Sequence, residues 1–401
     1  MLRFPWIGFL GTGALRIYML PVLALMLIVA VLHGEGYAET GEYPHHPVNF
    51  SLFYPISTNQ NPEVSTNFRL NLIYGDIGAV RGVDINGVVG RVRRDMVGLQ
   101  ASGMYSHIDG EFTGVAASGF GNYVKSDAMG IQYAGLVNFV RGDFAGFQFA
   151  NVFNYVEGTL VGAQTTGLFN LNDGDVKYFQ YATMANAVAG DFTGAQAAVG
   201  LNYVNETMVG GQLALCNFAK YMKGIQVGLG NVAGEATGVQ VGFVNYAVSL
   251  DGIPIGVINV SGEGGADWVT FGSNLAAIST GVRTVHGRFY SFFAVGIGDL
   301  KDKRNDTAFL SWNYGYAIPV ASRWSFGFDV GYVHIMPTPS SDPDVNGKSH
   351  FAIQGRVIAE IRFSEKVAIF GGGGVSQVYS EFSCDAASST DPLVVLGISL
   401  Y

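Results

Sequence analysis

Hydrophobic and polar residues follow two patterns along the chain. Between residues 80 and 262 the same residue types return at a fixed interval, whereas residues 39–79 and 263–401 alternate apolar, often aromatic, residues with small or polar ones. Alternation with period two is typical of β-strands, and a fixed interval of this length is typical of repeat architectures. We therefore expect an all-β chain in which a tandem-repeat region lies between two sets of strands.

A recurring glutamine marks the repeat. Gln returns at one fixed interval from Gln100 to Gln212, which defines the long units, and at an interval two residues shorter from Gln212 to Gln240, which defines the short units. Asp84, Ala116 and Pro254 take its place in three of the twelve units. A Gly stands two residues earlier in nearly every unit, with Tyr178 as the exception. An Asn follows, six residues after the Gln in long units and five in short ones. Gly-Asp pairs between units predict turns, so each unit reads as strand, bend, strand and turn.

The favoured architecture for these units is a parallel β-solenoid, in which each unit forms one coil and equivalent residues stack in columns. Amide side chains suit such columns because each carries both a donor and an acceptor. The predicted ladder residues are Gln132, Gln148, Gln164, Gln180, Gln196 and Gln212, with Asn122, Asn138, Asn154, Asn170, Asn186 and Asn202. The predicted apolar interior comprises Phe112, Phe144, Leu160, Val176 and Phe192, with Val115, Ile131, Phe147 and Ile225.

The alternative is one large antiparallel β-barrel, in which each unit is a strand with its Gln and Asn facing the lumen. Two features argue against it. Identical turns at both ends of every strand give no net stagger, which a closed barrel requires. The short units would also move Asn to the face opposite Gln.

The flanking segments predict the antiparallel strands of a small outer-membrane barrel. Residues 39–79 supply N-terminal strands within Val48–Ile56 and Phe68–Tyr74, and residues 263–401 supply the others, eight or nine in all. Small outer-membrane barrels have about eight strands, and Tyr401 resembles their terminal aromatic residue. The alternative is a soluble β-sandwich, which would not usually place aromatic side chains on its solvent face.

Residues 1–38 have the order of residues found in a signal peptide. Arg3 and Arg16 come first, an apolar run over 17–32 follows, and the small residues Gly36 and Ala38 end the segment. We expect export with cleavage after Ala38, and the alternative is an uncleaved membrane anchor.

Composition narrows the possible partners. Charged residues make up only 13% of the chain and apolar residues 49%, which excludes intrinsic disorder. A net charge of -9 without a basic patch argues against a nucleic-acid partner. We expect outer-membrane lipid as a partner, together with an envelope or extracellular ligand that the sequence does not identify. Cys216 and Cys384 are too far apart in sequence for a disulfide framework or a zinc-site spacing.

Candidate chemistry is sparse, and we predict neither catalytic residues nor a cofactor. Glycine-rich runs lack the strand-to-helix context of a nucleotide site, and the histidines lack metal-site spacing. The acids Asp127, Asp143, Asp175 and Asp191 share one turn position. Stacked coils would bring some of them about 5 Å apart. They are therefore candidates for bound calcium, and the alternative is plain turn chemistry.

The segment from Val48 to about Val295 resembles a family of bacterial surface-repeat proteins first named from a leptospiral surface repeat. The resemblance is carried by Ser57-Thr58-Asn59, residues 67–72, the repeated Gly-x-Gln and Asn, residues 251–256, residues 280–283 and Phe289-Tyr290. It implies a surface or outer-membrane location and supplies no reaction.

These observations lead to a functional hypothesis. The chain is expected to be a non-enzymatic structural or adhesion-type protein of the outer membrane and cell surface, with a barrel of flanking strands that carries the repeats as a solenoid. The alternative is an outer-membrane channel whose barrel includes the repeats as strands. A carbohydrate-active enzyme would need a cluster of acids that the sequence does not show.

Overall fold

The computed structural model describes residues 44–262, 264–298, 307–337, 350–379 and 388–401. The signal-peptide prediction for residues 1–38 lies outside them. The chain divides into two units, Met1–Val199 and Gly200–Tyr401. Its fold combines a parallel β-solenoid of about 12 turns with a closed barrel of eight antiparallel strands, which confirms the predicted fold class. Across the described ranges, no helix has the length and apolar character needed to cross a membrane.

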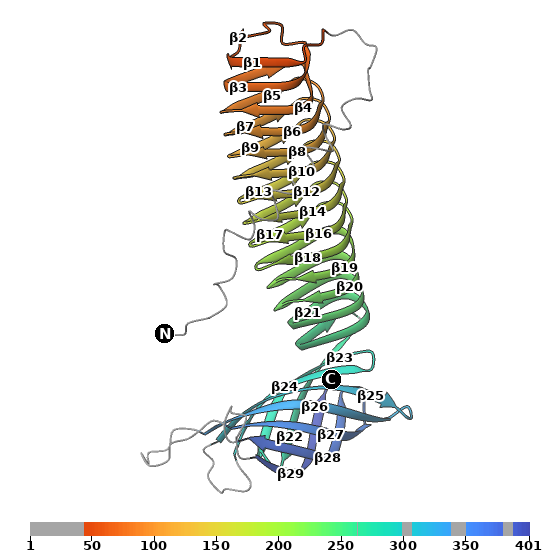
Figure 1. The fold of residues 1–401 in the computed structure, drawn as a ribbon. Coiled ribbons are helices and arrows are strands. Elements are labelled where there is room, and N and C mark those ends of the chain that lie inside the picture. The colour runs from red at the N-terminus through yellow and green to blue at the C-terminus, as the bar shows by residue number, and fades with distance from the viewer. Residues whose placement is uncertain (1–43, 263, 299–306, 338–349, 380–387) are drawn as a thin grey trace, which may run out of the picture. The chain divides into compact units, whose positions relative to one another are not determined.

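The first unit consists of stacked solenoid coils (Figure 1). Its strands are β1 (Val48–Phe53), β2 (Ile56–Ser57), β3 (Ser65–Ile77), β4 (Ala79–Asn86), β5 (Val89–Val92), β6 (Met96–Ser102), β7 (Tyr105–Ile108), β8 (Phe112–Ser118), β9 (Gly121–Val124), β10 (Ala128–Ala134), β11 (Val137–Val140), β12 (Phe144–Ala150), β13 (Phe153–Val156), β14 (Leu160–Thr166), β15 (Phe169–Asn172), β16 (Val176–Ala182), β17 (Ala185–Val188) and β18 (Phe192–Ala198).

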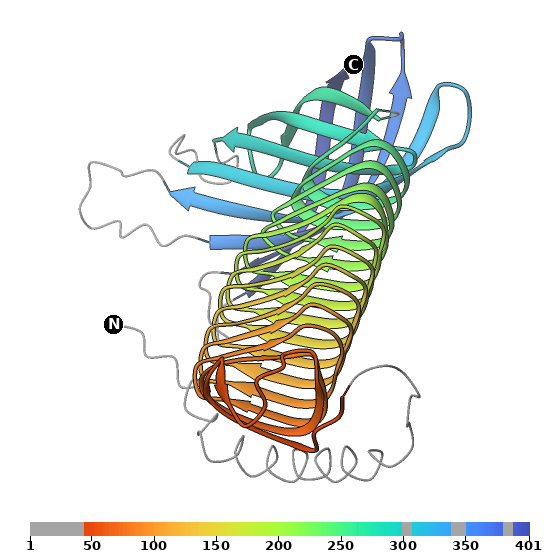
Figure 2. The same cartoon turned by 90° about the horizontal axis from the view of Figure 1, so that it is seen from above.

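Neighbouring coils run parallel and in the register of the repeat. In the pair β10 and β12, Gln132 lies opposite Gln148, and in the pair β11 and β13, Asn138 lies opposite Asn154. In Figure 2 the coils of the first unit lie one behind another. The alternative of one large antiparallel barrel is therefore wrong, because antiparallel pairing would place each unit opposite a reversed copy of itself.

The two strands of a coil are separated by a bend, so both the Gln and the Asn of a unit point into the coil. Alternation along each strand then decides the rest of the interior. Of the nine predicted interior residues, Phe112, Phe144, Leu160, Val176 and Phe192 are buried. The prediction is wrong for Val115, Ile131, Phe147 and Ile225, because each immediately precedes a residue of the Gln column and so points outward. Phe147 is 51% exposed and Ile225 50%.

The glycine two residues before each Gln is fixed by backbone geometry. Gly130, for example, has a φ of 128°, and a Cβ atom there would lie 1.9 Å from the carbonyl oxygen of Gly114 in the preceding coil. Only glycine meets both conditions without strain. Tyr178 occupies the same position with a φ of 103°, a conformation that L-residues rarely adopt.

The prediction that residues 39–79 supply barrel strands is wrong for strands β1 to β4, and residues 39–43 lie outside the described residues. Strand β1 pairs in parallel with β3, and β3 pairs in parallel with β4 and β5, so these strands form the first coils of the solenoid. Arg69 stands in the Gln column, opposite Asp84. Period-two alternation fits a solenoid strand as well as a barrel strand, and the absence of Gln at this position concealed the register.

The second unit contains shorter coils and then the barrel. The coils are formed by β19 (Leu201–Leu213), β20 (Cys216–Val227) and β21 (Gly230–Ser261), and Gln212 pairs with Gln226 although the short units begin here. The barrel strands are β22 (Gly265–Ser273), β23 (Ile278–His286), β24 (Phe289–Ile297), β25 (Thr307–Pro319), β26 (Trp324–Pro337), β27 (His350–Arg362), β28 (Val367–Tyr379) and β29 (Ser388–Leu400). Strands β22 and β29 pair and close it.

Candidate functional sites

The predicted glutamines form a continuous hydrogen-bonded column from Gln132 to Gln196 in the first unit. Each Gln donates its Nε2 to the Oε1 of the Gln in the preceding coil, at 2.7–2.8 Å from Gln148 to Gln196. In the second unit Gln226 donates to Gln212, and Gln240 donates to Gln226. These side chains are almost fully buried. The column therefore satisfies polar groups inside a narrow core, where an unpaired amide would be costly.

The asparagines form a second column whose polarity is opposite. Asn122 Nδ2 donates to Asn138 Oδ1 of the following coil at 2.9 Å, and Asn138, Asn154 and Asn170 continue this pattern in the first unit. In the second unit the same bonds run from Asn202 to Asn259. The remaining Nδ2 hydrogen of Asn122 reaches the carbonyl of Tyr133, which holds the bend of the coil.

The Gln column begins with charged residues. Arg69 and Asp84 form a two-point ion pair, Nε to Oδ1 at 2.6 Å and Nη2 to Oδ2 at 2.7 Å, and both side chains are buried. Gln100 Nε2 then donates to Asp84 Oδ2 at 2.9 Å. A buried carboxylate is tolerated here because the guanidinium and the amide together satisfy its oxygens.

Three of the four aspartates considered for calcium accept a backbone amide of the next coil. Asp127 Oδ1 accepts the amide of Asp143 at 2.8 Å, Asp143 Oδ1 accepts that of Thr159, and Asp175 Oδ1 accepts that of Asp191. Each carboxylate thus stabilises the turn of the next coil. Within the described part of the chain, no three His, Cys, Asp or Glu side chains meet at a metal-binding distance. The structure shows a turn function for Asp127, Asp143 and Asp175, and calcium binding stays a prediction.

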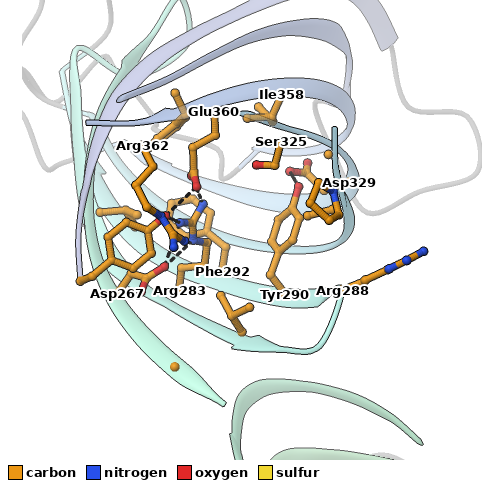
Figure 3. A pocket seen from close by; sticks show the side chains of 18 of the residues that line it. Asp267, Arg283, Arg288, Tyr290, Phe292, Ser325, Asp329, Ile358, Glu360 and Arg362 are labelled. Atoms are coloured by element: carbon orange, nitrogen blue, oxygen red, sulfur yellow. Dashed lines mark hydrogen bonds and ion pairs between the residues drawn. The ribbon is translucent and has the colours of Figure 1, made fainter. Parts of the chain in front are cut away.

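The barrel lumen contains a charged network that the sequence did not suggest (Figure 3). Arg283 bonds Asp267 through Nε and Nη2 and bonds Glu360 through Nη1. Arg356 pairs with Asp329 at 2.8 Å, and Tyr290 donates its hydroxyl to the same carboxylate. These residues come from β22, β23, β24, β26 and β27, so they meet only when the barrel closes.

Apolar side chains fill the lumen beside this network. One cluster contains Phe271, Phe292 and Phe370 with smaller residues, and a second contains Phe309 and Val333. A cavity of about 380 Å³ remains at the end where β22 begins, lined by Asp267, Arg283, Tyr290, Phe292 and Tyr401 among others. Eight strands enclose a space that side chains can just fill, so this lumen resembles a packed core more than a pore.

A second hollow, of about 520 Å³, lies on the outer surface of the first unit. We call it the solenoid groove. It is lined by Tyr74, Val89, Arg91, Tyr105, His107, Asp109, Tyr123, Lys125 and Arg141 from consecutive coils. Its side wall is a column of rings, in which His107 and Tyr123 have centroids 4.8 Å apart and Tyr123 and Phe139 5.3 Å apart. The rings stack face to face, so their edges and polar atoms point outward.

Ion pairs of Asp109 lie at one end of this groove. Arg91 Nη2 lies 2.8 Å from Asp109 Oδ2, and His107 Nε2 lies 3.1 Å from Asp109 Oδ1. Burial alone would raise the pKa of Asp109, but the bonds from Arg91 and His107 outweigh it and hold that pKa below its ordinary value. The hydrogen bond to Asp109 likewise raises the pKa of Arg91. Both groups are therefore held in their charged forms.

Sequence reasoning missed the groove and the lumen network for different reasons. Aligning the long units on their Gln residues places Asp109, Lys125, Arg141 and Glu157 in one column, so the groove could have been read from the sequence. The lumen residues share no period, because their proximity depends on strand order and stagger in the barrel.

Comparisons with known proteins found one weak structural similarity. No family model matches the chain, and no curated protein matches it. Among solved structures, the chain is similar to the N-terminal β-barrel domain of Pseudomonas aeruginosa OprF, with 11% sequence identity and a TM-score of 0.27. That similarity covers 34% of this chain and 96% of the OprF domain.

Proposed function

We propose that the chain is an outer-membrane protein in which the β22–β29 barrel is the membrane anchor and the solenoid is a non-enzymatic scaffold. The observation that carries the proposal is the inverted polarity of the barrel wall. Its interior holds charged residues such as Arg283, Asp329 and Arg356, while its outer face is apolar. Outward residues at least 36% exposed include Trp268, Val282, Val295, Phe326, Phe328, Val330, Ile353, Val357, Ile369, Val375, Val394, Leu396 and Ile398.

Such a wall suits lipid better than water. A water-soluble barrel buries its apolar side chains and exposes its charged ones, since charged groups pay heavily for desolvation. Here aliphatic and aromatic side chains cover the outside, and the buried charges are paired. Outer-membrane barrels have this arrangement, with apolar residues outward and polar residues inward.

The lengths of the connections between strands support a periplasmic location for the last coils, those of the second unit. At one barrel end the strands are joined by short segments, residues 287–288, 320–323 and 363–366. At the other end three of the four connections are longer, residues 298–306, 338–349 and 380–387. Outer-membrane barrels place short turns in the periplasm and long loops outside the cell. Strand β22 begins at the short-turn end, so the coils that precede it enter from the periplasm.

Contacts within the second unit reinforce this attachment. Gly256 of the last coil accepts hydrogen bonds at its carbonyl from Ser291 Oγ and from Trp312 Nε1. Asn259 N donates to Thr284 Oγ1, and Ser261 Oγ lies 2.8 Å from His286 Nδ1. Thr284, His286 and Ser291 all lie near the short-turn end of their strands. We therefore favour a periplasmic scaffold over an adhesin on the outer surface.

The two cysteines provide a direct test in intact cells. Cys216 is a free, exposed thiol in β20, and Cys384 lies in the long connection 380–387. Single-cysteine variants, Cys384→Ser and Cys216→Ser, would be treated with a membrane-impermeant maleimide. We expect Cys384 to react in intact cells and Cys216 only after the outer membrane is permeabilised. Labelling of Cys216 alone in intact cells would show the opposite orientation. Recovery of the chain as a soluble periplasmic protein would contradict the proposed membrane anchor.

A further inference from the structure

The solenoid groove concentrates positive charge in an otherwise acidic chain. Arg91, Lys125 and Arg141 contribute three positive charges to its lining, against one negative charge from Asp109. The whole chain carries a formal charge of -9 and only 22 Lys and Arg residues. A local excess of this sign favours an anion, because the surrounding surface would otherwise repel one.

Two of these cations are neighbours in the same column. Val124 pairs with Val140 across β9 and β11, so Lys125 and Arg141, which follow them, stand one coil apart, about 4.8 Å along the stack. Like charges at this spacing repel each other. Arg141 bonds Glu157 on its far side at 3.2 Å. Asp109 stands one coil away on the far side of Lys125 but pairs with Arg91 and His107, and no ion pair of Lys125 is found among the described residues. An anion placed between them would remove the repulsion.

The aromatic column determines what else the groove can contact. The faces of Tyr123 and Phe139 are covered by their neighbours in the stack, with interplanar angles of 21–29° along the column. A flat ring of a ligand therefore has no open face to stack on within this column. The phenol groups of Tyr105 and Tyr123 line the groove and can exchange hydrogen bonds with hydroxyl groups. A volume of about 520 Å³ also exceeds what a single inorganic anion fills.

We propose that the solenoid groove binds an acidic saccharide. Its oxyanion lies between Lys125 and Arg141, and its hydroxyl groups contact Tyr105 and Tyr123. Arg91, already paired with Asp109, defines the closed end of the site. The proposal does not depend on the side of the membrane that the repeats occupy.

The test is a binding titration of the full-length protein in detergent micelles. The probe is an oligogalacturonate, with an uncharged dextran oligosaccharide and inorganic phosphate as comparisons. We expect the oligogalacturonate to bind, the dextran not to bind, and the affinity to fall as salt is added. The double variant Lys125→Gln/Arg141→Gln should weaken binding at least about tenfold. The matched control Lys177→Gln/Lys223→Gln removes the same charge from exposed positions outside the groove and should leave affinity unchanged.

A third variant separates a saccharide site from a bare anion site. Tyr123→Phe keeps the ring stack and removes one hydroxyl, so it should weaken oligogalacturonate and leave phosphate unaffected. The proposal is overturned if the groove variant binds like the wild type, or if the control weakens binding equally. It is also overturned if dextran binds as well as the acidic probe, or if oligogalacturonate fails to bind at about 1 mM. The circular dichroism spectrum of each variant is measured first, so that a misfolded variant is not mistaken for one that has lost the binding site.

Discussion

Ala116 interrupts the glutamine column of the first unit. In this gap Gln100 Oε1 and Gln132 Nε2 face each other across one coil, and both atoms are buried without a hydrogen-bond partner among the described residues. A glutamine at position 116 would supply both missing partners, because each Gln of the column donates to the preceding coil and accepts from the following one. A buried polar atom without a partner costs about 1–3 kcal/mol, so the gap weakens a column that is otherwise satisfied.

Replacing Ala116 by Gln should therefore stabilise the protein. The new Nε2 would donate to Gln100 and the new Oε1 would accept from Gln132, and these bonds should outweigh the lost side-chain entropy by about 1 kcal/mol. Thermal unfolding followed by circular dichroism would show a higher Tm. The control Ala116→Leu fills the same space without hydrogen bonds. An equal gain for Ala116→Leu would show that packing, and not the amide ladder, is responsible.

The coil is the unit that repeats, and its hydrogen bonds are made with adjacent coils. The Gln column donates toward the N-terminal end of the stack and the Asn column toward the C-terminal end, so the two rows of amide dipoles oppose each other. Stacked repeats interact only with their neighbours, and their stability is close to a sum of coil and interface contributions. We therefore expect the stack to fold after loss of a whole coil, but not after loss of part of one.

Removal of residues 144–159 tests this rule. The deletion joins Asp143 to Leu160 and brings Gln132 opposite Gln164, so we expect a folded protein with a modestly lower Tm. Removal of residues 144–151 deletes half as much chain but leaves Gln132 and Gln164 one and a half coils apart, so the stacked register is lost at the junction. This shorter deletion should expose buried amides and abolish folding, as measured by circular dichroism and resistance to protease. Equal behaviour of the two deletions would contradict the stacked register.

At the scale of the whole molecule, the barrel is predicted to lie in lipid. Its outer wall must then be apolar, whereas its lumen can hold charged side chains. The channel with the repeats as strands does not fit the parallel coils. Phe271, Phe292, Phe370 and the Arg283 network also argue against a channel through the eight-stranded barrel, because these side chains occupy the path an ion would take. A barrel in lipid also requires that outward side chains in the middle of its strands carry no charge.

A charge on that wall should prevent stable insertion. Val330 is 63% exposed near the middle of β26, and Val320, also 63% exposed, lies in a short turn beyond the strands. Val330→Arg should destabilise the inserted barrel by about 2–4 kcal/mol, whereas Val320→Arg should have little effect. Urea unfolding in lipid vesicles measures the stability of each variant, and the amount recovered in the outer-membrane fraction measures its insertion. Equal tolerance of the two substitutions would indicate that the wall faces water.

The sequence by itself determined the solenoid. The step between Gln residues sets the coil length, the glycine before each Gln permits the close approach of adjacent backbones, and the paired amides fix the parallel register. These features are local or strictly periodic, so they are visible without a structure. The change from long to short units does not disturb the two columns, because the bend between strands allows Gln212 and Asn217 to point inward together.

Only the tertiary structure decided the rest. Residues 48–77 show the alternation of barrel strands, and pairing alone assigned them to the solenoid, with Arg69 in the Gln column. Asp267, Arg283 and Glu360 lie on three strands, and the last two are 77 residues apart in sequence. Their meeting depends on barrel closure and stagger, which are long-range properties that no local pattern encodes.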